Sequence, residues 1–547
     1  MQLNPWSKKE TPLSRPPIDV PPESLTFPLR RAAETYPEKV AIISPEAGGK
    51  ETTYRWLEDH ASVLAASLAD LGVSVGDRVG LWMKNSLEYI LSYYGILKAG
   101  AIVVPISTHY GSREVLQQLN VTEAKGLLAD DGLIGPGRDP FSDVKTLHFM
   151  ITNGSEEPGP GTLPFSSLLT GSGRMDRSIG TDPLQTLAVL PFSSGTTGLP
   201  KGVMLTHSNL LSNLYQIVQA HEVSEGDLLM NQLPFFHIYG MTVLMGASIM
   251  AGATQVLASR FRPLENFLHL FQTYRPTLFF TVPLIIQEFC RQPMLADLDW
   301  SRLRYINTGG APLSPEVQER FTQITGVPVM QGYGLTESSP TTHVNPVRRI
   351  KVGSIGLPLA NTEDRIADPL TGAELPSPEV GELWIRGPQV MKGYYRDPEA
   401  TAETLVDGWL RTGDLAMKDG EGYVYIVDRL KELIKTKGFQ VAPAEIEHVL
   451  VGHPDILDAA VIGEPHPEFG EVPVACVVLR PDASLSGEAI IEYAANGLAK
   501  YKRLAGVVIT DAIPRSPSGK ILRRLVKESL FPRPSESGAD FPPKNFG

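Results

Sequence analysis

The sequence predicts an α/β protein with a large N-terminal domain of several subdomains and a small C-terminal domain. Three observations support this prediction. The chain has 547 residues, of which 42% are hydrophobic, so it is too long for one typical domain. Helical patterns alternate with short apolar runs over roughly the first two thirds of the chain. After about Gly353 the pattern changes to short strands separated by glycine and proline turns.

Short apolar runs that end at glycine, proline or serine are typical of buried strands in βαβ units. The runs are Lys39–Ser44, Arg78–Trp82, Ala101–Pro105, Thr186–Phe192, Leu278–Val282 and Tyr305–Thr308. A helical pattern, Leu87–Ala99, lies between the second and third. Because ligands gather where the strands of an open α/β sheet end, we expect the functional residues to follow these runs.

The later part of the chain predicts different elements. Gly381–Arg386 and Tyr423–Val427 read as strands of a smaller β-rich subdomain. An α/β region follows over about residues 430–530, and residues 531–547 are expected to be a disordered tail.

Composition excludes several classes of function. The chain carries 49 basic and 61 acidic residues, so its net charge of −12 gives no bulk attraction for nucleic acid. Cys290 and Cys476 have no zinc-site or disulfide spacing. The N-terminus shows no signal peptide, so we expect a cytoplasmic protein, with peripheral membrane association and homodimerisation left open.

One uncharged segment, Ile238–Ala258, approaches the length of a membrane span. It is interrupted by three glycines and several polar residues. We therefore predict a buried helix, a turn near Ala251-Gly252 and a short strand, and no transmembrane segment.

The strongest local motif is the glycine-rich segment Ser193–Gly202, SSGTTGLPKG, which follows a predicted strand and precedes a helical pattern around Ser208–Ala220. Glycines let backbone N–H groups approach an anion, hydroxyls donate to phosphate oxygens, and Lys201 adds positive charge. The alternative is a flexible surface turn, which would not require so many donors within ten residues.

Two further clusters follow predicted strands. In Gln331–Glu337, QGYGLTE, which comes after the expected strand Pro328–Met330, Tyr333 can stack on a purine and Glu337 can hold Mg²⁺. Gly309–Pro312 can line a pocket wall, and Ser314 with Pro315 fits the N-cap and first position of a helix. Either cluster alone is equally compatible with a plain turn.

Basic and acidic side chains recur near the C-terminal region. Asp414 can bind a ribose diol, and Arg429 can form a forked contact with ribose or phosphate. The lysines of the run Lys431–Lys437 can equally form a solvated face. Lys520 lies on a glycine- and serine-containing loop, where a surface lysine is the simpler interpretation.

Together the motifs resemble those of the adenylate-forming superfamily, which includes acyl-CoA synthetases, 4-coumarate–CoA ligases, luciferases and peptide-synthetase adenylation domains. SSGTTGLPKGV, QGYGLTE, GWLRTGD, VDRLKELIKTKGFQVAPAEIE and SPSGK occur in the family order over roughly residues 25–530. The resemblance implies two doubly wound sheets and a small β-barrel-like subdomain in residues 1–430. It also implies a mobile α+β lid in residues 431–530 with a hinge at Lys431.

The resemblance also implies ATP, Mg²⁺ and coenzyme A as cofactors and substrates. It assigns triphosphate contacts to Ser193, Ser194, Gly195, Thr196, Thr197, Gly198 and Lys201, and adenine contacts to Gly310, Ala311, Pro312, Gln331, Gly332, Tyr333 and Gly334. Asp414 and Arg429 would hold the ribose, Thr336 would reach the α-phosphate, and Glu337 with Thr197 would hold Mg²⁺. Lys520 would serve adenylate formation.

The implied second step transfers the acyl group to coenzyme A after the small domain rotates. Lys435, Lys437, Gly438, Phe439 and Gln440 would then face the site in place of Lys520. The acyl pocket would consist of Tyr239, Val243, Gly309, Pro340 and Thr341, with His237 in the adjoining aromatic motif and Gly334 beside it.

The identity of the acid is left between alternatives. We favour a medium- or long-chain fatty acid, because Gly309 and Gly334 leave room for a long tail and residues 21–40 and 338–346 look like fatty acyl-CoA synthetases. The alternative is a 4-coumarate-type aryl acid, which the hinge region resembles. An alternative of another class is a non-catalytic sensor that binds ATP or acyl groups.

Overall fold

The computed structural model divides the chain into two compact units. It describes residues 15–134, 144–154, 161–178, 182–193, 200–258, 261, 263–436, 439–481, 483–515 and 521–530. The first unit comprises the residues up to Thr412 with Met417–Tyr425, and the second comprises Gly413–Ala416 with the residues from Ile426 onward. Strand β22 (Trp409–Lys418) therefore contributes to both units. The predicted hinge at Lys431 stays a prediction.

The first unit contains two large sheets. The first sheet has the order β17-β16-β15-β14-β13-β11-β12-β1-β2. Its strands are β1 (Val40–Ser44), β2 (Lys50–Thr53), β11 (Leu228–Asn231), β12 (Thr254–Leu257), β13 (Leu278–Thr281), β14 (Tyr305–Thr308), β15 (Val329–Gly334), β16 (Thr341–Val344) and β17 (Leu357–Pro358). The central strands from β1 to β15 are parallel, and β2, β16 and β17 pair antiparallel at the edges.

The second sheet has the order β20-β10-β8-β4-β3-β5-β6-β7, with β9 beside β10. Its strands are β3 (Arg78–Trp82), β4 (Ile102–Pro105), β5 (Gly126–Asp130), β6 (Phe149–Asn153), β7 (Thr162–Pro164), β8 (Leu187–Val189), β9 (Phe192–Ser193), β10 (Lys201–Thr206) and β20 (Gly393–Tyr394). Strands β8, β4, β3, β5, β6 and β7 are parallel, as the continuous apolar runs predict for a sheet covered on both faces.

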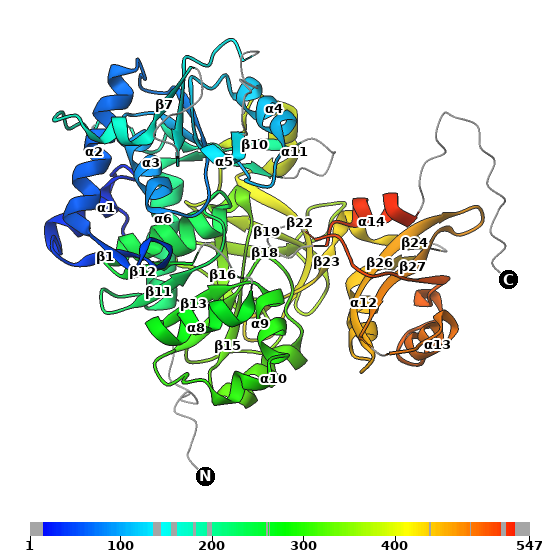
Figure 1. The fold of residues 1–547 in the computed structure, drawn as a ribbon. Coiled ribbons are helices and arrows are strands. Elements are labelled where there is room, and N and C mark those ends of the chain that lie inside the picture. The colour runs from blue at the N-terminus through cyan, green and yellow to red at the C-terminus, as the bar shows by residue number, and fades with distance from the viewer. Residues whose placement is uncertain are drawn as a thin grey trace. The chain divides into compact units, whose positions relative to one another are not determined.

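Helices of the first unit connect these strands (Figure 1). They are α1 (Phe27–Thr35), α2 (Tyr54–Asp70), α3 (Leu87–Lys98), α4 (Ser112–Thr122), α5 (Asp131–Ile134), α6 (His207–His221), α7 (Ala247–Ala251), α8 (Leu264–Tyr274), α9 (Pro283–Cys290), α10 (Pro315–Thr325) and α11 (Pro398–Thr404). One buried apolar cluster includes residues of α2, α3, α8 and both sheets, so the two sheets share a core. The predicted cap of α10 is confirmed, because Ser314 Oγ accepts a hydrogen bond from the Val317 N–H at 3.3 Å.

The uncharged segment folds as predicted. A π-helical segment (Tyr239–Gly246) leads into α7, Gly252 adopts a left-handed conformation with φ +70°, and β12 follows. Within the described residues, no helix is long and apolar enough to span a membrane. Peripheral membrane association and dimerisation stay predictions.

One sequence prediction was wrong before the glycine-rich motif. The expected strand Thr186–Phe192 is split into β8 and β9, because Pro191 has no N–H to donate to a neighbouring strand. The helical pattern predicted around Ser208–Ala220 is confirmed by α6 (His207–His221). Strand β10 intervenes before α6, and its Val203 and Leu205 side chains are fully buried.

A smaller sheet in the order β18-β19-β22-β21, with β23 beside β22, follows Gly353. Its other strands are β18 (Glu363–Ala367), β19 (Gly381–Arg386), β21 (Leu405–Val406) and β23 (Val424–Arg429). It corresponds to the β-rich subdomain that the sequence predicts.

The second unit has an α+β fold, as predicted. Its sheet has the order β25-β24-β27-β26, with β28 beside β27. The elements are β24 (Ile434–Thr436), β25 (Phe439–Val441), β26 (Ile456–His466), β27 (Gly470–Leu479), β28 (Gly506–Ile509), α12 (Pro443–Val451), α13 (Gly487–Gly497) and α14 (Arg523–Leu530). Its core lies between the sheet and helices α12 and α13.

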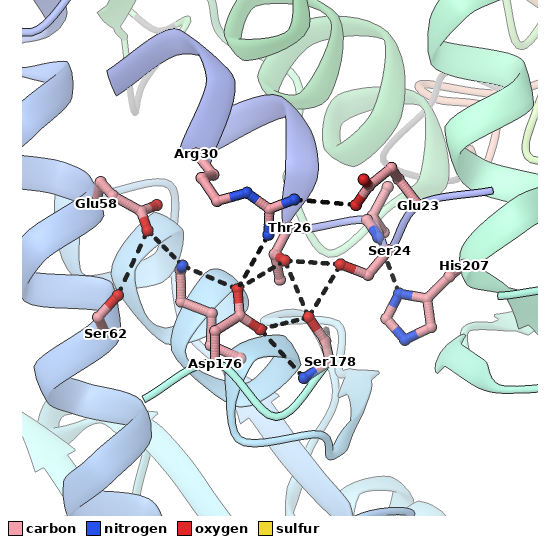
Figure 2. A network of polar contacts seen from close by, with 11 residues as sticks. Glu23, Ser24, Thr26, Arg30, Glu58, Ser62, Asp176, Ser178 and His207 are labelled. Atoms are coloured by element: carbon pink, nitrogen blue, oxygen red, sulfur yellow. Dashed lines mark hydrogen bonds and ion pairs between the residues drawn. The ribbon is translucent and has the colours of Figure 1, made fainter. Parts of the chain in front are cut away.

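Within the first unit, a buried polar network links the segment around Leu25 to α3 and α6 (Figure 2). The Lys98 side chain is 1% exposed, and its Nζ lies 2.6 Å from Glu58 Oε1 and 3.2 Å from Asp176 Oδ2. The Leu25 N–H donates to His207 Nδ1 at 3.0 Å. The positive charge of Lys98 is thus compensated by two carboxylates, as burial of an ammonium group requires.

Candidate functional site

The two ends of the glycine-rich segment lie side by side. Ser193 in β9 pairs with Lys201 in β10 in an antiparallel register. The predicted contact residues between them, Ser194, Gly195, Thr196, Thr197 and Gly198, lie outside the described residues. The residues at the two ends of the segment thus belong to paired antiparallel strands.

Glu337, in the short helical turn Thr336–Ser338, meets one end of this hairpin. Ser193 Oγ donates to Glu337 Oε1 at 2.8 Å, and the Tyr394 hydroxyl donates to the same oxygen at 3.0 Å. Burial and the adjacent negative charge of Glu337 raise the pKa of Tyr394, so its hydroxyl keeps its proton. Tyr394 was not among the residues expected from the sequence. Its signal was the Gly-Tyr-Tyr run at residues 393–395, within the β-rich region.

Lys201 lies in the same cluster. Its Nζ is 3.6 Å from Asp397 Oδ2 and 5.3 Å from the centroid of the Tyr394 ring. One amine, two carboxylates and two hydroxyls thus converge where the glycine-rich hairpin begins and ends. This combination suits the binding of a polyphosphate with its counter-ion.

The donor set fits Mg²⁺ held jointly by protein and substrate. Mg²⁺ in nucleotide sites usually binds one or two carboxylates together with phosphate oxygens and water. Glu337 supplies such a carboxylate. Over the part of the chain that the structure describes, no group of three or more His, Cys, Asp or Glu side chains could form an all-protein metal site.

The predicted adenine segments come together at neighbouring strand ends. Gln331–Gly334 form the end of β15 rather than a loop after it, which corrects the shorter predicted strand. Gln331 Oε1 accepts the Leu313 N–H at 3.0 Å and so holds the turn Gly309–Pro312. Position 310 favours glycine, because its backbone has a φ of +83°, which other residues rarely adopt.

Tyr333 packs against a buried charged network. Its ring meets His343 edge-on at 6.1 Å between centroids. His343 Nε2 lies 3.3 Å from Asp364 Oδ2, and Lys418 Nζ lies 2.9 Å from Asp364 Oδ1. Burial alone would raise the pKa of Asp364, but the contacts with His343 and Lys418 outweigh it and lower the pKa to about 2. Sequence reasoning missed this network, because its members lie on three strands.

The predicted acyl-pocket residues include a polar pair. The Tyr239 hydroxyl donates to the Thr281 carbonyl oxygen at 3.2 Å and lies 3.4 Å from Asn307 Nδ2. A Cβ at Gly309 would meet the Tyr239 ring at 3.5 Å, and a Cβ at Gly332 would meet Asn307 Oδ1 at 3.3 Å. A hydroxyl and an amide therefore lie beside these glycines, in a region that the sequence suggested to be small and apolar.

The expectation that Gly334 leaves room for a long acyl tail is wrong. A Cβ at this position would lie 1.9 Å from the Pro340 carbonyl oxygen and 3.0 Å from Thr341 Cα. The space is filled by backbone, and Gly334 is required because β15 and β16 approach each other there. Thr341 is itself held by Asn213, which exchanges two hydrogen bonds of 3.0 and 2.7 Å with its backbone.

His237 is a neutral side chain in this region. Burial lowers the pKa of His237 to about 4. The ring accepts the Tyr239 N–H at Nδ1 over 3.2 Å, so the proton of the neutral imidazole lies on Nε2. Val243 is buried on the π-helical segment that follows.

In the second unit, the two predicted ribose ligands contact each other. Arg429 Nε lies 3.1 Å from Asp414 Oδ1, and the Asp414 side chain is 5% exposed. The carboxylate of Asp428, which directly precedes Arg429 in the sequence, accepts the Arg429 and Ala444 N–H groups at 2.6 and 2.9 Å. The hinge candidate Lys431 follows on a short helical turn.

Three of the residues expected to act in thioester formation belong to the paired strands β24 and β25, namely Lys435, Phe439 and Gln440. Lys435 is exposed and pairs with Gln440 across the hairpin. The Phe439 side chain is 52% exposed and stacks on Tyr501 at 4.5 Å. Lys437, Gly438 and Lys520 lie outside the described residues, as does the side chain of Gln440.

Comparison with known proteins then decides the family. Residues 29–395 match the model of the AMP-binding enzyme family, and residues 445–520 match the AMP-binding enzyme C-terminal domain. The chain belongs to the AMP-binding enzyme family. This confirms the predicted superfamily, the α/β fold and the class of acid–thiol ligases.

Individual members of the family are similar over nearly their whole length. The chain is 39% identical to 4-coumarate–CoA ligase-like 9 of Oryza sativa subsp. japonica over 534 residues, which is 95% of each chain. ATP-bound MatB from Rhodopseudomonas palustris has 29% identity and a TM-score of 0.84, covering 93% of this chain and 98% of its own. A benzoate CoA ligase from Burkholderia xenovorans LB400 has 26% identity and a TM-score of 0.83, covering 92% and 100%.

Proposed function

We propose that the chain is an ATP-dependent carboxylic acid:CoA ligase that forms an acyl-adenylate, and that its acid is a 4-coumarate-type aryl-propenoic acid. The observation that carries the proposal is the cluster of Ser193, Lys201, Glu337 and Tyr394 at the glycine-rich hairpin. It brings the residues expected to bind triphosphate together with a carboxylate suited to Mg²⁺.

Adenylate formation requires one anion to attack another. The substrate carboxylate attacks the α-phosphorus, forms a C–O–P link and displaces pyrophosphate, so no protein nucleophile is needed. Lys201 supplies positive charge to the triphosphate, and Lys520 does so for the charge that develops during attack. Glu337 and Thr197 would hold Mg²⁺, whose charge would offset that of the phosphates.

The nucleotide would be held by contacts from several strands. Tyr333 would stack on adenine beside the turn Gly310–Pro312, and Gln331 keeps that turn in place. Thr336 would contact the α-phosphate. Asp414 would accept from the ribose hydroxyls, with Arg429 orienting its carboxylate.

The second step would transfer the acyl group to the thiol of coenzyme A and release AMP. Lys435, Lys437, Gly438, Phe439 and Gln440 would serve this step. The exposed ring of Phe439 and the exposed amine of Lys435 suit contacts with a pantetheine arm and its phosphates.

Two observations favour an aryl acid over the fatty acid expected from the sequence. The similar proteins include a 4-coumarate–CoA ligase-like protein and a benzoate CoA ligase. Among the described residues, Asn307 Oδ1 is also a buried acceptor without a hydrogen-bond partner, and an alkyl chain would offer it no donor, which disfavours an alkyl substrate. The neutral imidazole of His237 can donate from Nε2 to a carboxylate or acyl oxygen.

The test measures pyrophosphate release and loss of free coenzyme A thiol with 4-coumarate, cinnamate, octanoate and palmitate. We expect kcat/KM for 4-coumarate to exceed that for octanoate by about tenfold or more. A preference for octanoate or palmitate would overturn the aryl assignment. Absence of pyrophosphate release with every acid would overturn the adenylation chemistry and favour a binding protein.

A further inference from the structure

The loop that carries His237 and Tyr239 is held by a side chain from the other large sheet. The loop follows β11 of the first sheet, whereas Asn85 follows β3 of the second. Asn85 Nδ2 donates to the Leu233 carbonyl oxygen at 2.7 Å, and the Phe235 N–H donates to Asn85 Oδ1 at 2.7 Å. The amide thus pairs with the loop backbone as a peptide unit of a neighbouring strand would.

Tyr89 strengthens the same contact. It lies on the first turn of α3, and its hydroxyl donates to the Phe235 carbonyl oxygen at 2.9 Å. The Tyr89 and Phe235 rings are both fully buried, and their centroids are 5.6 Å apart. Three hydrogen bonds and a ring contact therefore fix Leu233–Phe235 to the start of α3.

The anchor itself is rigid. The Lys84 N–H donates to Asp130 Oδ2 at 2.8 Å, which ties the residue before Asn85 to the end of β5. Ser86, the next residue, caps α3 by accepting the Tyr89 N–H at 3.0 Å. Asn85 is consequently held on both sides by the second sheet and its helix.

Contacts continue from this anchor to the functional side chains. The Pro234 carbonyl oxygen accepts the His237 N–H at 3.2 Å. It also lies 2.1 Å from the position of a Cβ at Gly240, so the turn closes tightly on itself. His237 Nδ1 in turn accepts the Tyr239 N–H. The positions of both rings thus depend on where residues 233–235 are held.

We propose that Asn85, assisted by Tyr89, is a positioning residue that fixes His237 and Tyr239 in the acid-binding site. The acid-binding part of this inference rests on the proposed function. Asn85 would act through the loop backbone, to which its amide oxygen and nitrogen are hydrogen-bonded. Its loss should therefore weaken acid use more than ATP use, because a displacement of about 1 Å at a reacting group can cost on the order of a hundredfold in rate.

The experiment compares Asn85→Ala, Asn85→Asp and Tyr89→Phe with wild type. Asn85→Asp keeps the acceptor for the Phe235 N–H and replaces the donor to Leu233 by an oxygen. Asn120→Ala is the matched control, because Asn120 is an exposed asparagine on α4, a helix that connects strands of the same sheet. The measurements are kcat, the KM for acid and the KM for ATP in pyrophosphate release, and the His237 pKa from NMR of histidine-labelled protein.

We expect Asn85→Ala to lower kcat/KM for the acid by about tenfold to a hundredfold with the KM for ATP within about twofold of wild type. Asn85→Asp and Tyr89→Phe should show smaller losses in the same direction. The pKa of His237 should move from about 4 toward its ordinary value as the loop opens to water. Asn120→Ala should leave all four quantities unchanged.

Two results would overturn the positioning role: equal losses for acid and ATP in the Asn85 variants, or acid kinetics and a His237 pKa that stay at wild-type values. If Asn85→Ala does not fold, Tyr89→Phe decides, because it removes one hydroxyl and retains the ring. If wild type activates no acid, the proposed function fails and the His237 pKa alone decides the positioning role.

Discussion

Replacing His207 with asparagine should make the protein less sensitive to mild acid. His207 is 2% exposed at the start of α6, and its Nδ1 accepts the Leu25 N–H (Figure 2). Burial lowers the pKa of His207 to about 4, although the nearby negative charge of Asp176 opposes the shift. Protonation would place a hydrogen on Nδ1, remove the acceptor for Leu25 and leave a buried cation.

The size and sign of the effect follow from the two pKa values. The pKa is about 4 in the folded state and about 6.5 in the unfolded state, so the unfolded state binds more protons between these values. The stability that neutral His207 provides is fully present above pH 6.5 and is lost as the pH falls toward 4. The linkage relation gives a loss of about 2 kcal/mol between pH 7 and pH 5.

Urea unfolding at pH 7 and pH 5, followed by tryptophan fluorescence, measures this loss. His207→Asn should show a smaller difference between the two pH values by about 2 kcal/mol, because an amide oxygen can accept the Leu25 N–H without titrating. His221 and His237 should keep part of the acid sensitivity, since burial lowers their pKa values to about 3 and about 4. His269→Asn, at an exposed position on α8, is the control. An unchanged pH dependence in His207→Asn would refute the reasoning.

Four further predictions concern the site. Gly334→Ala should destabilise the fold by at least about 2 kcal/mol in thermal unfolding, because its Cβ would overlap the Pro340 carbonyl oxygen, whereas Gly309→Ala should fold normally. Equal stability of the two variants would contradict this packing. Gly309→Ala should lower kcat/KM for 4-coumarate by about 10- to 200-fold, and unchanged kinetics would place the aryl ring elsewhere. Lys520→Ala should slow pyrophosphate release yet spare thioester formation from preformed acyl-adenylate, and equal losses in both assays would refute its role. Glu337→Gln should raise the Mg²⁺ concentration needed for half-maximal pyrophosphate release, and an unaltered Mg²⁺ titration would remove Glu337 from the metal site.

Local patterns in the sequence predicted the elements that are determined locally. The strands at Arg78–Trp82 and Tyr305–Thr308 were predicted with their observed bounds, because both are short apolar runs buried on both faces. The Ser314 cap of α10 was predicted because a serine before proline satisfies the first turn of a helix through its own side chain.

Other features depend on contacts between distant positions, and these were missed. Asn85 contacts Leu233 across 148 positions of the sequence, and only its place after a predicted strand could have suggested a role. Gly334 was interpreted as open space because a missing Cβ does not reveal which atoms replace it. The contact between Asp414 and Arg429 was missed because each side chain was considered separately as a ribose ligand, and not as a partner of the other.

The course of β22 has a practical consequence for exchanging parts between relatives. Leu415, in the middle of this strand, shares a small apolar cluster with Leu433 and Ala442 of the second unit, and Val427 packs against them. Leu430 also packs against this cluster, so a fragment that starts at residue 431 would keep Leu433 and Ala442 and lose the other three residues. Chimeric proteins joined at residue 431 should therefore tolerate the exchange only when both donors carry compatible apolar side chains at positions 415, 427 and 430. A transplant of residues 413–416 together with all residues from 426 onward would avoid this restriction.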